Sequence, residues 1–303
     1  MQLGIDLGGT KIAAIVLDRD GRAVWESRAL TPRDDYDGTL RAIATLVAAG
    51  EAAAGRPCTV GVGTPGAVSP ATGVIKNANS TWLNGRSFDA DLGQRLGRSV
   101  RTANDANCLA MSEAADGAAA GARVVFGAIV GTGVGGGIVV DGRPLVGPNA
   151  IAGEWGHNPL PWPADEERPG PACYCGRKGC LETFLSGPGL HADYVRRCGV
   201  ARGHGSEMVA ALVSAGDACA AGTMVVWFDR LARALASVIN VLDPDVIVLG
   251  GGLSQIGGLY TEVPRLWTRW VFSDIVATRL VPARFGDASG VRGAARLWPA
   301  ESC

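Results

Sequence analysis

The chain has 303 residues, of which 47% are hydrophobic and 19% are charged, and its formal net charge is −1. A chain of this length and balance is expected to fold as a globular protein with two lobes. The balanced charge argues against a protein that binds nucleic acid or a membrane surface, and no apolar stretch is long enough to span a bilayer.

The start of the chain and the cysteine content bear on location. A strand pattern begins at Leu3 with no basic and apolar leader before it, so no signal peptide is predicted. Eight cysteines without an export signal favour a reducing, cytoplasmic location. Five of the cysteines are expected to be ordinary core or surface thiols: Cys58, Cys108, Cys198, Cys219 and Cys303.

A β-hairpin is predicted at the N-terminus. Strand patterns over residues 3–7 and 12–17 flank the turn Gly8-Gly9-Thr10-Lys11, and an Asp-Gly turn follows at residues 18–21. The same order recurs much later in the chain, where residues 124–130 lead into Gly131-Thr132-Gly133.

This second hairpin continues with a strand that ends at Val140 and with the turn Asp141-Gly142. The repeat predicts a duplicated architecture with a ligand between the two copies. Because glycine-rich hairpins are common, a chance likeness is the alternative.

The remaining elements alternate between strand and helix. Helices are expected over residues 39–54, 107–120, 224–241 and 290–295, and strands over residues 99–103 and 245–249. The last helix consists mostly of small residues and is expected to pack closely on a neighbour. The alternation predicts an α/β fold.

The first hairpin turn has the chemistry of a phosphate site. The N–H groups of Gly8 and Gly9 and the hydroxyl of Thr10 can face phosphate oxygens. Lys11 offers a positive charge to the same oxygens, and Asp6 could hold Mg²⁺ directly or through water. The spacing is not that of a P-loop, and a strand follows the turn where a P-loop has a helix.

The second turn strengthens this interpretation. With Thr132 and Gly133, two similar hairpins could grip a triphosphate from both sides. The alternative is a pair of ordinary hairpins without a ligand.

Asp105 is a candidate general base. It lies between a predicted strand and a predicted helix, at the rim of an α/β sheet where ligands collect. An N-cap role for Asp105 is the alternative. The turns at residues 63–66 and 77–82 carry polar side chains suited to sugar hydroxyls, or they are simple loops.

One imidazole and three thiols fall within a short, glycine- and proline-rich segment: His157, Cys173, Cys175 and Cys180. Three thiolates and a neutral imidazole satisfy the tetrahedral preference of zinc and leave no open position, which predicts a structural metal. Buried small side chains or a disulfide are the alternatives. The metal would also hold Glu154 and Glu182, which lie beside the cluster.

These motifs resemble the ROK family of sugar kinases and repressors, and the likeness runs over essentially the whole chain. The shared patterns are Asp-x-Gly-Gly-Thr-Lys, Gly-x-Pro-Gly, Asn-Asp-Ala-Asn, Gly-Thr-Gly-x-Gly, Gly-Glu-x-Gly-His and Cys-x-Cys-Gly-x-x-Gly-Cys-x-Glu. Within the family, residues 77–85, 157–162 and 290–299 look most like the bacterial fructokinase (manno-fructokinase) branch.

The resemblance implies roles for individual residues. Asp105 is expected to be the catalytic base. Sugar contacts are expected from Asn79, Asn104, Asp105, Glu154, His157 and Glu182. Zinc is expected on His157, Cys173, Cys175 and Cys180. ATP is expected at Asp6, Gly8, Gly9, Thr10, Lys11, Thr132 and Gly133, with adenosine near Gly250, Gly251 and Gly252.

The implied fold is an α/β, actin/hexokinase-like (ribonuclease H-like) fold with two lobes, a duplicated hairpin core and an active-site cleft between the lobes. Residues 1–117 with 290–303 would form the small lobe, and residues 118–289 the large one. A homodimer is what the family suggests.

The resulting hypothesis is an ATP- and Mg²⁺-dependent kinase that phosphorylates the 6-hydroxyl of D-fructose. His157 would bind zinc with one ring nitrogen and donate to the sugar with the other. A kinase for mannose, glucose or N-acetylglucosamine is the main alternative, because sugars that differ in one substituent are separated by few contacts. A sugar-responsive repressor is the second alternative, although the net charge and the early first strand argue against it.

Overall fold

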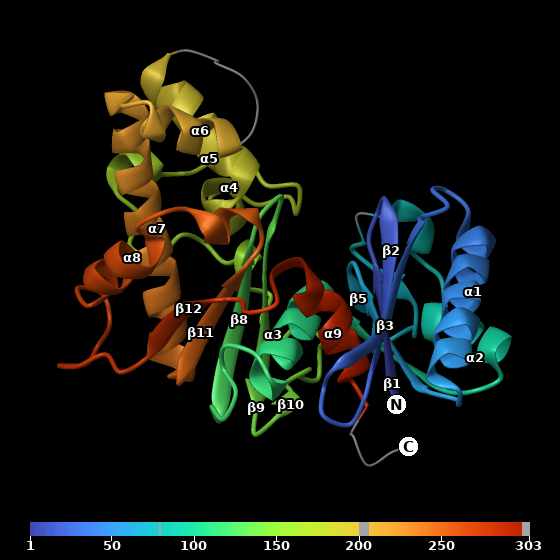
Figure 1. Cartoon of the computed structure of the whole chain (residues 1–303). Helices are drawn as coiled ribbons and strands as arrows, with labels where there is room; N and C mark the ends of the chain where they lie inside the picture. The colour runs from blue at the N-terminus through green and yellow to red at the C-terminus, as the bar shows by residue number, and fades with distance from the viewer. Residues whose placement is uncertain (79, 200–205, 299–303) are drawn as a thin grey trace. The chain divides into compact units, whose positions relative to one another are not determined.

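The computed structural model describes residues 1–78, 80–199 and 206–298 and divides into two compact units (Figure 1). The first comprises Met1–Gly121, Gly137–Ala152 and Ala283–Cys303, and the second comprises Ala122–Gly136 and Gly153–Pro282. These units differ from the lobes expected from the sequence, chiefly in residues 137–152. The assignment of the phosphate hairpins, the zinc loop and the adenosine site to two lobes stays a prediction.

The first sheet has the strand order β3-β2-β1-β4-β7. Its strands are β1 (Gln2–Leu7), β2 (Lys11–Leu17), β3 (Ala23–Leu30), β4 (Thr59–Thr64) and β7 (Val100–Asn104). The first three are antiparallel, whereas β4 runs parallel to β1 and β7 parallel to β4. The predicted N-terminal hairpin is therefore confirmed, with Leu7 opposite Ile12.

The two faces of β1 pack against different helices because side chains alternate along a strand. Leu3 and Ile5 belong to the core that includes Leu40 and Ile43 of α1 (Tyr36–Ala54). On the opposite face, a Cβ on Gly4 would lie 2.0 Å from the backbone oxygen of Val291 in α9.

Besides β1, α9 (Ser289–Ala295) also lies close to the helix α3 and to the strand β4. A Cβ on Gly293 of α9 would lie 1.7 Å from the carbonyl oxygen of Cys108 in α3 (Asp105–Ala115). A Cβ on Gly61 of β4 would lie 1.9 Å from the carbonyl oxygen of Ala294 in α9. The predicted tight packing of the final helix is confirmed, and glycines on both partners make it possible.

The second sheet repeats the order of the first, as β10-β9-β8-β11-β12. Its strands are β8 (Val124–Val130), β9 (Val134–Val140), β10 (Arg143–Pro144), β11 (Val246–Gly250) and β12 (Arg279–Pro282). Again one antiparallel set is followed by two parallel neighbours, since β11 pairs with β8 and β12 with β11. The duplication predicted from the two hairpins is confirmed.

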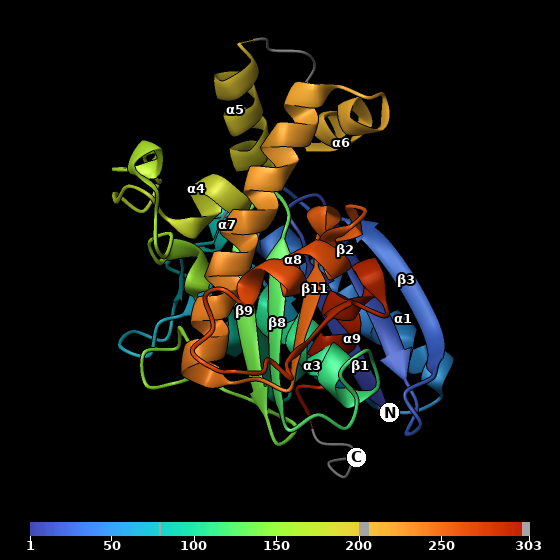
Figure 2. The ribbon, with the colours of Figure 1, turned by 90° about the vertical axis from the view of Figure 1, so that its left-hand side faces the viewer.

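Helices of the second unit cover one face of its sheet, where α7 (Ala218–Leu242) and α8 (Leu259–Trp267) run side by side (Figure 2). The predicted helix over residues 224–241 lies inside α7, which begins earlier because Asp217 accepts from the Ala220 N–H and caps it. Among the described residues no helix is long and apolar enough to cross a membrane.

The shorter elements complete both units. They are α2 (Phe88–Leu96), α4 (Leu181–Leu185), α5 (Gly187–Cys198), α6 (Ser206–Ser214), β5 (Ala67–Val68), β6 (Ile75–Lys76) and the 3₁₀ turns Thr81–Leu83, Trp155–His157, Asp165–Glu167, Gly252–Gln255 and Gly286–Ala288. The predicted helix over residues 107–120 ends early, at Ala115. There the Glu113 carboxylate accepts from the Ala118 N–H and turns the chain.

Two of the cysteines expected to be thiols are not. Cys198, at the end of α5, forms a disulfide with Cys219, at the start of α7. The sequence separation of 21 residues carries no local signal of this pairing. Cys58 and Cys108 are buried free thiols as expected, and Cys303 lies outside the described residues.

Candidate functional site

The first turn (residues 8–10) is held by the loop that follows β3. The Thr31 hydroxyl donates to the Gly8 carbonyl at 2.7 Å, and Arg33 Nε donates to the Gly9 carbonyl at 3.2 Å. These bonds fix the backbone of the turn and leave the side chains of Thr10 and Lys11 exposed. Both side chains are therefore accessible to a ligand, as the phosphate hypothesis requires.

Two carboxylates of the first unit, Asp6 and Asp105, have raised pKa values. Desolvation, followed by the nearby charge of Asp105, raises the pKa of Asp6 to about 6, and Lys11 offsets this in part. Desolvation also raises the pKa of Asp105, although its Oδ1 accepts from the Ala106 N–H at 2.8 Å. Asp105 is nevertheless exposed to solvent, so a ligand can reach it.

The N-cap alternative for Asp105 is wrong. Asn104 caps α3, because its side-chain oxygen accepts from the Asn107 N–H at 2.7 Å. Asp105 is thereby available for chemistry, whereas the amide oxygen of Asn104 is committed to the helix.

Glycines keep room around Asp6. A Cβ on Gly63 would lie 3.6 Å from Asp6 Oδ1, and one on Gly290 would lie 3.2 Å from Asp6 Oδ2. Gly63 is the last residue but one of β4 and Gly290 is the second residue of α9, so two elements distant in sequence approach this carboxylate through their backbones. The role of Gly290 was not predicted, because its only signal was membership of a small-residue helix.

The predicted sugar loop adjoins the first turn. A Cβ on Gly9 would lie 3.6 Å from the hydroxyl oxygen of Ser80, whose side chain is buried. The loop is shaped by Asn84, which accepts from the Ala78 N–H and donates to the Ala78 carbonyl. Asn79, the predicted sugar contact in this loop, lies outside the described residues.

The second turn (residues 131–133) is held in a different way. Glu182, from α4, accepts from the Val134 N–H at 2.9 Å, and a Cβ on Gly133 would lie 2.8 Å from the same carboxylate oxygen. One oxygen of the predicted sugar residue Glu182 therefore supports the turn, a role that the sequence did not indicate. Thr132 is exposed beside it.

The predicted adenosine glycines lie next to this turn. A Cβ on Gly251 would lie 2.4 Å from the Val130 carbonyl oxygen, and one on Gly131 would lie 3.7 Å from the Gly252 nitrogen. Gly251 also has φ +84°, which favours glycine. The structure therefore brings these glycines together with Thr132 and Gly133.

Trp155 fastens the 153–157 segment to β9. Its Nε1–H donates to the Gly135 carbonyl at 2.7 Å, and its ring packs edge-on against Phe126 at 5.4 Å between centroids. Gly156 lies so close to β9 that a Cβ would meet the Val134 carbonyl oxygen at 1.9 Å. This packing positions the flanking Glu154 and His157.

The four predicted metal ligands converge. Their ligand atoms all lie within 4.8 Å of one another, with His157 Nδ1 at 3.5 Å from Cys173 Sγ and the sulfurs of Cys175 and Cys180 3.6 Å apart. A tetrahedral zinc site with ordinary bond lengths places its ligand atoms roughly 3.5–3.8 Å apart. The three cysteines are free thiols, so the disulfide alternative is wrong here.

A buried ion network anchors the segment that precedes the cysteines. Glu167 accepts from Arg230 at 2.7 Å and from Arg233 at 2.9 Å, and Asp193 also accepts from Arg230 at 2.7 Å. Although desolvation opposes it, bonding to the arginines lowers the pKa of Glu167 to about 2. No pattern in the sequence indicates this network, because α5, α7 and the 3₁₀ turn that supply its residues are far apart in the chain.

Tyr174, between two of the cysteines, is a further residue that sequence reasoning missed. Its hydroxyl lies 3.0 Å from His157 Nε2, and the two rings meet edge-on at 5.1 Å between centroids. Desolvation, then the charges of Glu182, Cys173 and Glu154, raise the pKa of Tyr174 to about 12. The ring nitrogen that was expected to face a sugar therefore faces Tyr174.

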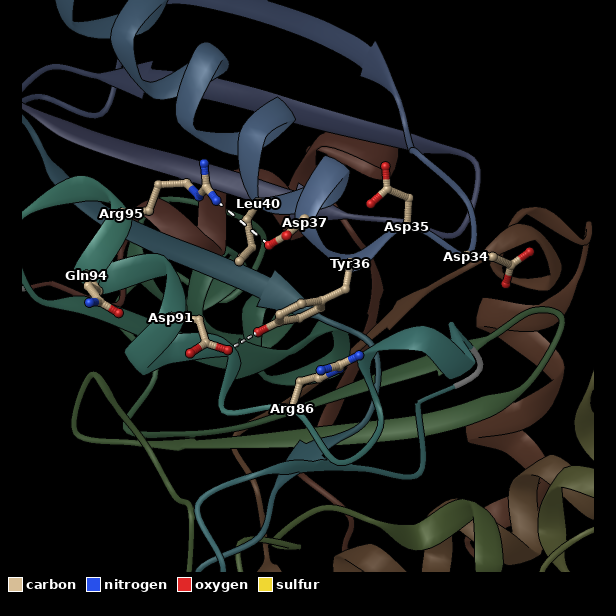
Figure 3. Close-up of a pocket in the computed structure, with 9 residues that line it drawn as sticks. All are labelled: Asp34, Asp35, Tyr36, Asp37, Leu40, Arg86, Asp91, Gln94 and Arg95. Atoms are coloured by element: carbon tan, nitrogen blue, oxygen red, sulfur yellow. Dashed lines mark hydrogen bonds and ion pairs between the residues drawn. The ribbon is translucent and has the colours of Figure 1, made fainter.

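Two cavities open in the first unit. One, of about 890 Å³, is bordered by Gly66, Ala67 and Asn104 and extends along α3. The other, of about 750 Å³, lies between the N-terminal end of α1 and α2, where Tyr36 donates to Asp91 at 2.6 Å (Figure 3). The first cavity contains a predicted site residue, and the second contains none.

Comparison with known proteins identifies the family. The family model described as "ROK family" matches residues 2–301. The chain belongs to the ROK family.

ROK relatives match nearly the whole chain. An N-acetyl-D-glucosamine kinase of Escherichia coli is 40% identical over 304 residues, covering 98% of this chain and 99% of its own. The crystal structure of a ROK hexokinase from Thermus thermophilus superposes with a TM-score of 0.86 at 34% identity, covering 98% of this chain and 97% of that one. The crystal structure of a ROK family glucokinase from Streptomyces griseus, in complex with glucose and AMPPNP, superposes with a TM-score of 0.77 at 28% identity, covering 98% of both chains.

The comparisons confirm the predicted actin/hexokinase-like α/β fold of two lobes. They do not support the fructokinase branch of the ROK family that the sequence motifs suggested. The relatives named above favour the alternative, a kinase for another hexose.

Proposed function

We propose that this ROK protein is an ATP-dependent kinase that phosphorylates the 6-hydroxyl of N-acetylglucosamine. The kinase assignment rests chiefly on Asp105, an exposed carboxylate at the start of α3 that is near enough to act electrostatically on Asp6 in β1. The choice of sugar rests on the relative that is 40% identical over the full length, an N-acetyl-D-glucosamine kinase.

In this proposal Asp105 accepts the proton of the sugar hydroxyl. The hydroxyl oxygen then forms a bond to the γ-phosphorus of ATP, the bond from that phosphorus to the bridging oxygen breaks, and ADP leaves. A raised pKa makes Asp105 a stronger base than an ordinary aspartate once it is ionised. Such positioning and charge neutralisation are the main demands of phosphoryl transfer.

The phosphates would be held by the two turns. Thr10 and Lys11 are exposed on the first turn and Thr132 on the second, so each can reach phosphate oxygens. Asp6, ionised at neutral pH because its pKa is about 6, would hold Mg²⁺. When bound, Mg²⁺ neutralises the charge that develops on the phosphates.

The metal cluster would be structural. His157 and the three cysteines supply all four ligands of a tetrahedral zinc ion and leave no position for substrate. Bound there, zinc would keep Glu154, His157 and Glu182 in place for the sugar. Sugar contacts from Asn79 and Asn104, and adenosine contacts from residues 250–252, complete the proposed site.

The cavity beside Asn104 has room for a sugar. It has a volume of about 890 Å³ and is bordered by the small residues Gly66 and Ala67. The expected homodimer and the cytoplasmic location stay predictions; sedimentation of the purified protein tests the first.

A sugar panel tests the substrate. We expect kcat/KM for N-acetylglucosamine to exceed that for glucose, mannose and fructose by at least about tenfold, the scale on which one pocket contact discriminates. Coupled measurement of ADP release at saturating ATP provides the values. A higher kcat/KM for fructose would restore the original hypothesis, and no ADP release with any of the sugars would refute the kinase assignment.

A further inference from the structure

The helix α4, which carries Glu182, is too short to be stable by itself. It has 5 residues, whereas isolated helices of fewer than about 12 residues are marginal in water. Glu182 nevertheless needs a fixed orientation, because its carboxylate accepts from the Val134 N–H of the second turn at 2.9 Å. The position of this carboxylate therefore depends on side chains that fix α4 from outside.

The long helix α7 supplies two such side chains where it lies against α4 (Figure 2). Trp227, which is fully buried, donates from Nε1 to the Leu185 carbonyl at 3.2 Å and satisfies a carbonyl at the end of α4. Arg230 lies one helical turn later on the same face of α7. Its guanidinium lies over the Phe184 ring, at 5.0 Å from the ring centroid. Both contacts are made to residues that follow Glu182 in α4.

Arg230 is in turn fixed by two buried carboxylates. Its Nε donates to Glu167 and its Nη1 to Asp193, both at 2.7 Å, and its side chain is only 1% exposed. Charge-assisted bonds to two different segments leave the planar guanidinium a single orientation. Replacing a buried ion pair by apolar side chains of the same shape commonly costs little stability, so these bonds favour a role in orientation over a role in stability.

Arg233, on the next turn of α7, provides a contrast. It is also buried and also donates to Glu167, at 2.9 Å. Its other hydrogen bonds within the described part of the chain go to Asp229 and to the carbonyls of Pro161 and Trp162, none of which belongs to α4. The two arginines thus share a carboxylate and differ in their contact with α4.

We propose that Arg230 is a positioning residue of the kinase: through the Phe184 ring it holds α4 so that the Glu182 carboxylate stays on the Val134 N–H. The second turn, which this bond supports, then keeps the backbone conformation that binds ATP phosphates. The inference rests on the proposed function, in which this turn is a phosphate site. Arg230 touches neither substrate and acts only through α4.

The test compares Arg230→Lys with Arg233→Lys. Lysine keeps the charge in each case but cannot bond two carboxylates as a planar fork or cover an aromatic ring in the same way. We expect Arg230→Lys to raise the KM for ATP about threefold to tenfold, and the Kd of a non-hydrolysable ATP analogue equally, while kcat stays within about twofold of wild type. Steady-state kinetics and calorimetry provide these values.

Arg233→Lys is the matched control. Its KM for ATP and its Kd for the analogue should stay within about twofold of wild type, because its contacts do not include α4. Thermal denaturation should show that both lysine variants are less stable than wild type, since each disturbs a buried ion network. The two variants thereby separate an effect on the turn from an effect on stability.

A double variant shows whether the effect passes through Glu182. If it does, Arg230→Lys should change the KM for ATP by less than about twofold in a protein that already carries Glu182→Gln, because the two residues act as one unit. A role in stability alone would give independent effects, and the two increases in KM would multiply. Multiplication of the increases would overturn the proposal.

Other results also decide. An unchanged KM for ATP in Arg230→Lys would contradict the proposal, and so would equal increases in both lysine variants, which would indicate general loosening of the network. An increase that follows loss of zinc, measured by elemental analysis, would show that Arg230 acts through the metal cluster instead.

Phe184→Leu keeps the proposal testable if Arg230→Lys does not fold. This change removes the ring beneath the guanidinium and leaves the ion network in place, so the same increase in the KM for ATP is expected, and its absence would overturn the proposal. A wild-type protein that releases no ADP with any sugar would refute the proposed function itself, and this result is separate from any property of the variants.

Discussion

The two glycine turns have the same place in two sheets of the same strand order, yet they are stabilised differently. The first turn is held within its own hairpin region, by Thr31 and Arg33. The second is held by Glu182, which comes from the helix directly after the last metal-ligand cysteine. The two sheets therefore share one topology, but only the second turn is bonded to a residue next to the metal cluster.

This difference separates the tasks of the two units. The first contains the proposed base and the exposed Thr10 and Lys11, with no metal cluster among its described residues. The second contains the cluster, and its phosphate turn and sugar residues share Glu182. Chemistry should therefore depend on the first unit, and zinc-dependent binding on the second.

Removal of the proposed base should have the largest effect. Asp105→Asn keeps the size of the side chain but cannot accept the proton, so kcat should fall by about 10²–10⁴-fold. Sugar affinity, measured by calorimetry, should stay within a few-fold of wild type. Near-normal turnover would remove Asp105 as the base and with it the chemical role of the first unit.

Metal removal tests the second unit. Sugar affinity should weaken by about 10–100-fold after chelation, the scale on which disturbed metal sites lose function, and this should precede global unfolding. Calorimetry and far-UV circular dichroism on a sample verified as metal-free provide the two readouts. Unchanged sugar binding in that sample would refute the link between the cluster and the site.

A pair of variants compares the two anchors directly. Glu182→Gln weakens a charge-assisted hydrogen bond to the second turn, and we expect KM for both ATP and sugar to rise about tenfold. Thr31→Val removes a neutral hydrogen bond to the first turn, and we expect only the KM for ATP to rise, by about threefold. Equal effects on both substrates in the two variants would contradict the proposed difference.

The smallest expected effect is on the pH dependence of stability without ligand. The pKa of Asp6 is raised from 3.8 to about 6, so the folded protein binds this proton more tightly than the unfolded chain. The contribution of Asp6 to stability therefore falls as the pH rises from about 4 to about 6. Denaturant unfolding across this range, without divalent cations, should show a steeper loss in the wild type than in Asp6→Asn, and parallel profiles would contradict the shift.

Local patterns predicted those parts of the protein that depend on residues close in sequence. The hairpins, their glycine turns and the repeat between them were confirmed, because alternation and turn residues act over a few positions. The Cys173–Cys180 spacing with His157 likewise indicated a metal cluster, and the ligand atoms do converge. The helix boundaries were less accurate, because caps such as Asn104 and Asp217 are single side chains with several possible roles.

Contacts between distant residues could be decided only by the tertiary structure. The Cys198–Cys219 disulfide, the bond from Val134 to Glu182 and the Glu167–Arg230 pair each join elements whose sequences carry no sign of the partner. The pKa of Asp6 depends in the same way on Asp105, almost a hundred positions away. Sequence alone determined which chemical groups this protein has and their local order; folding determined which of them meet, because burial, charge and hydrogen bonding depend on distance in space and not along the chain.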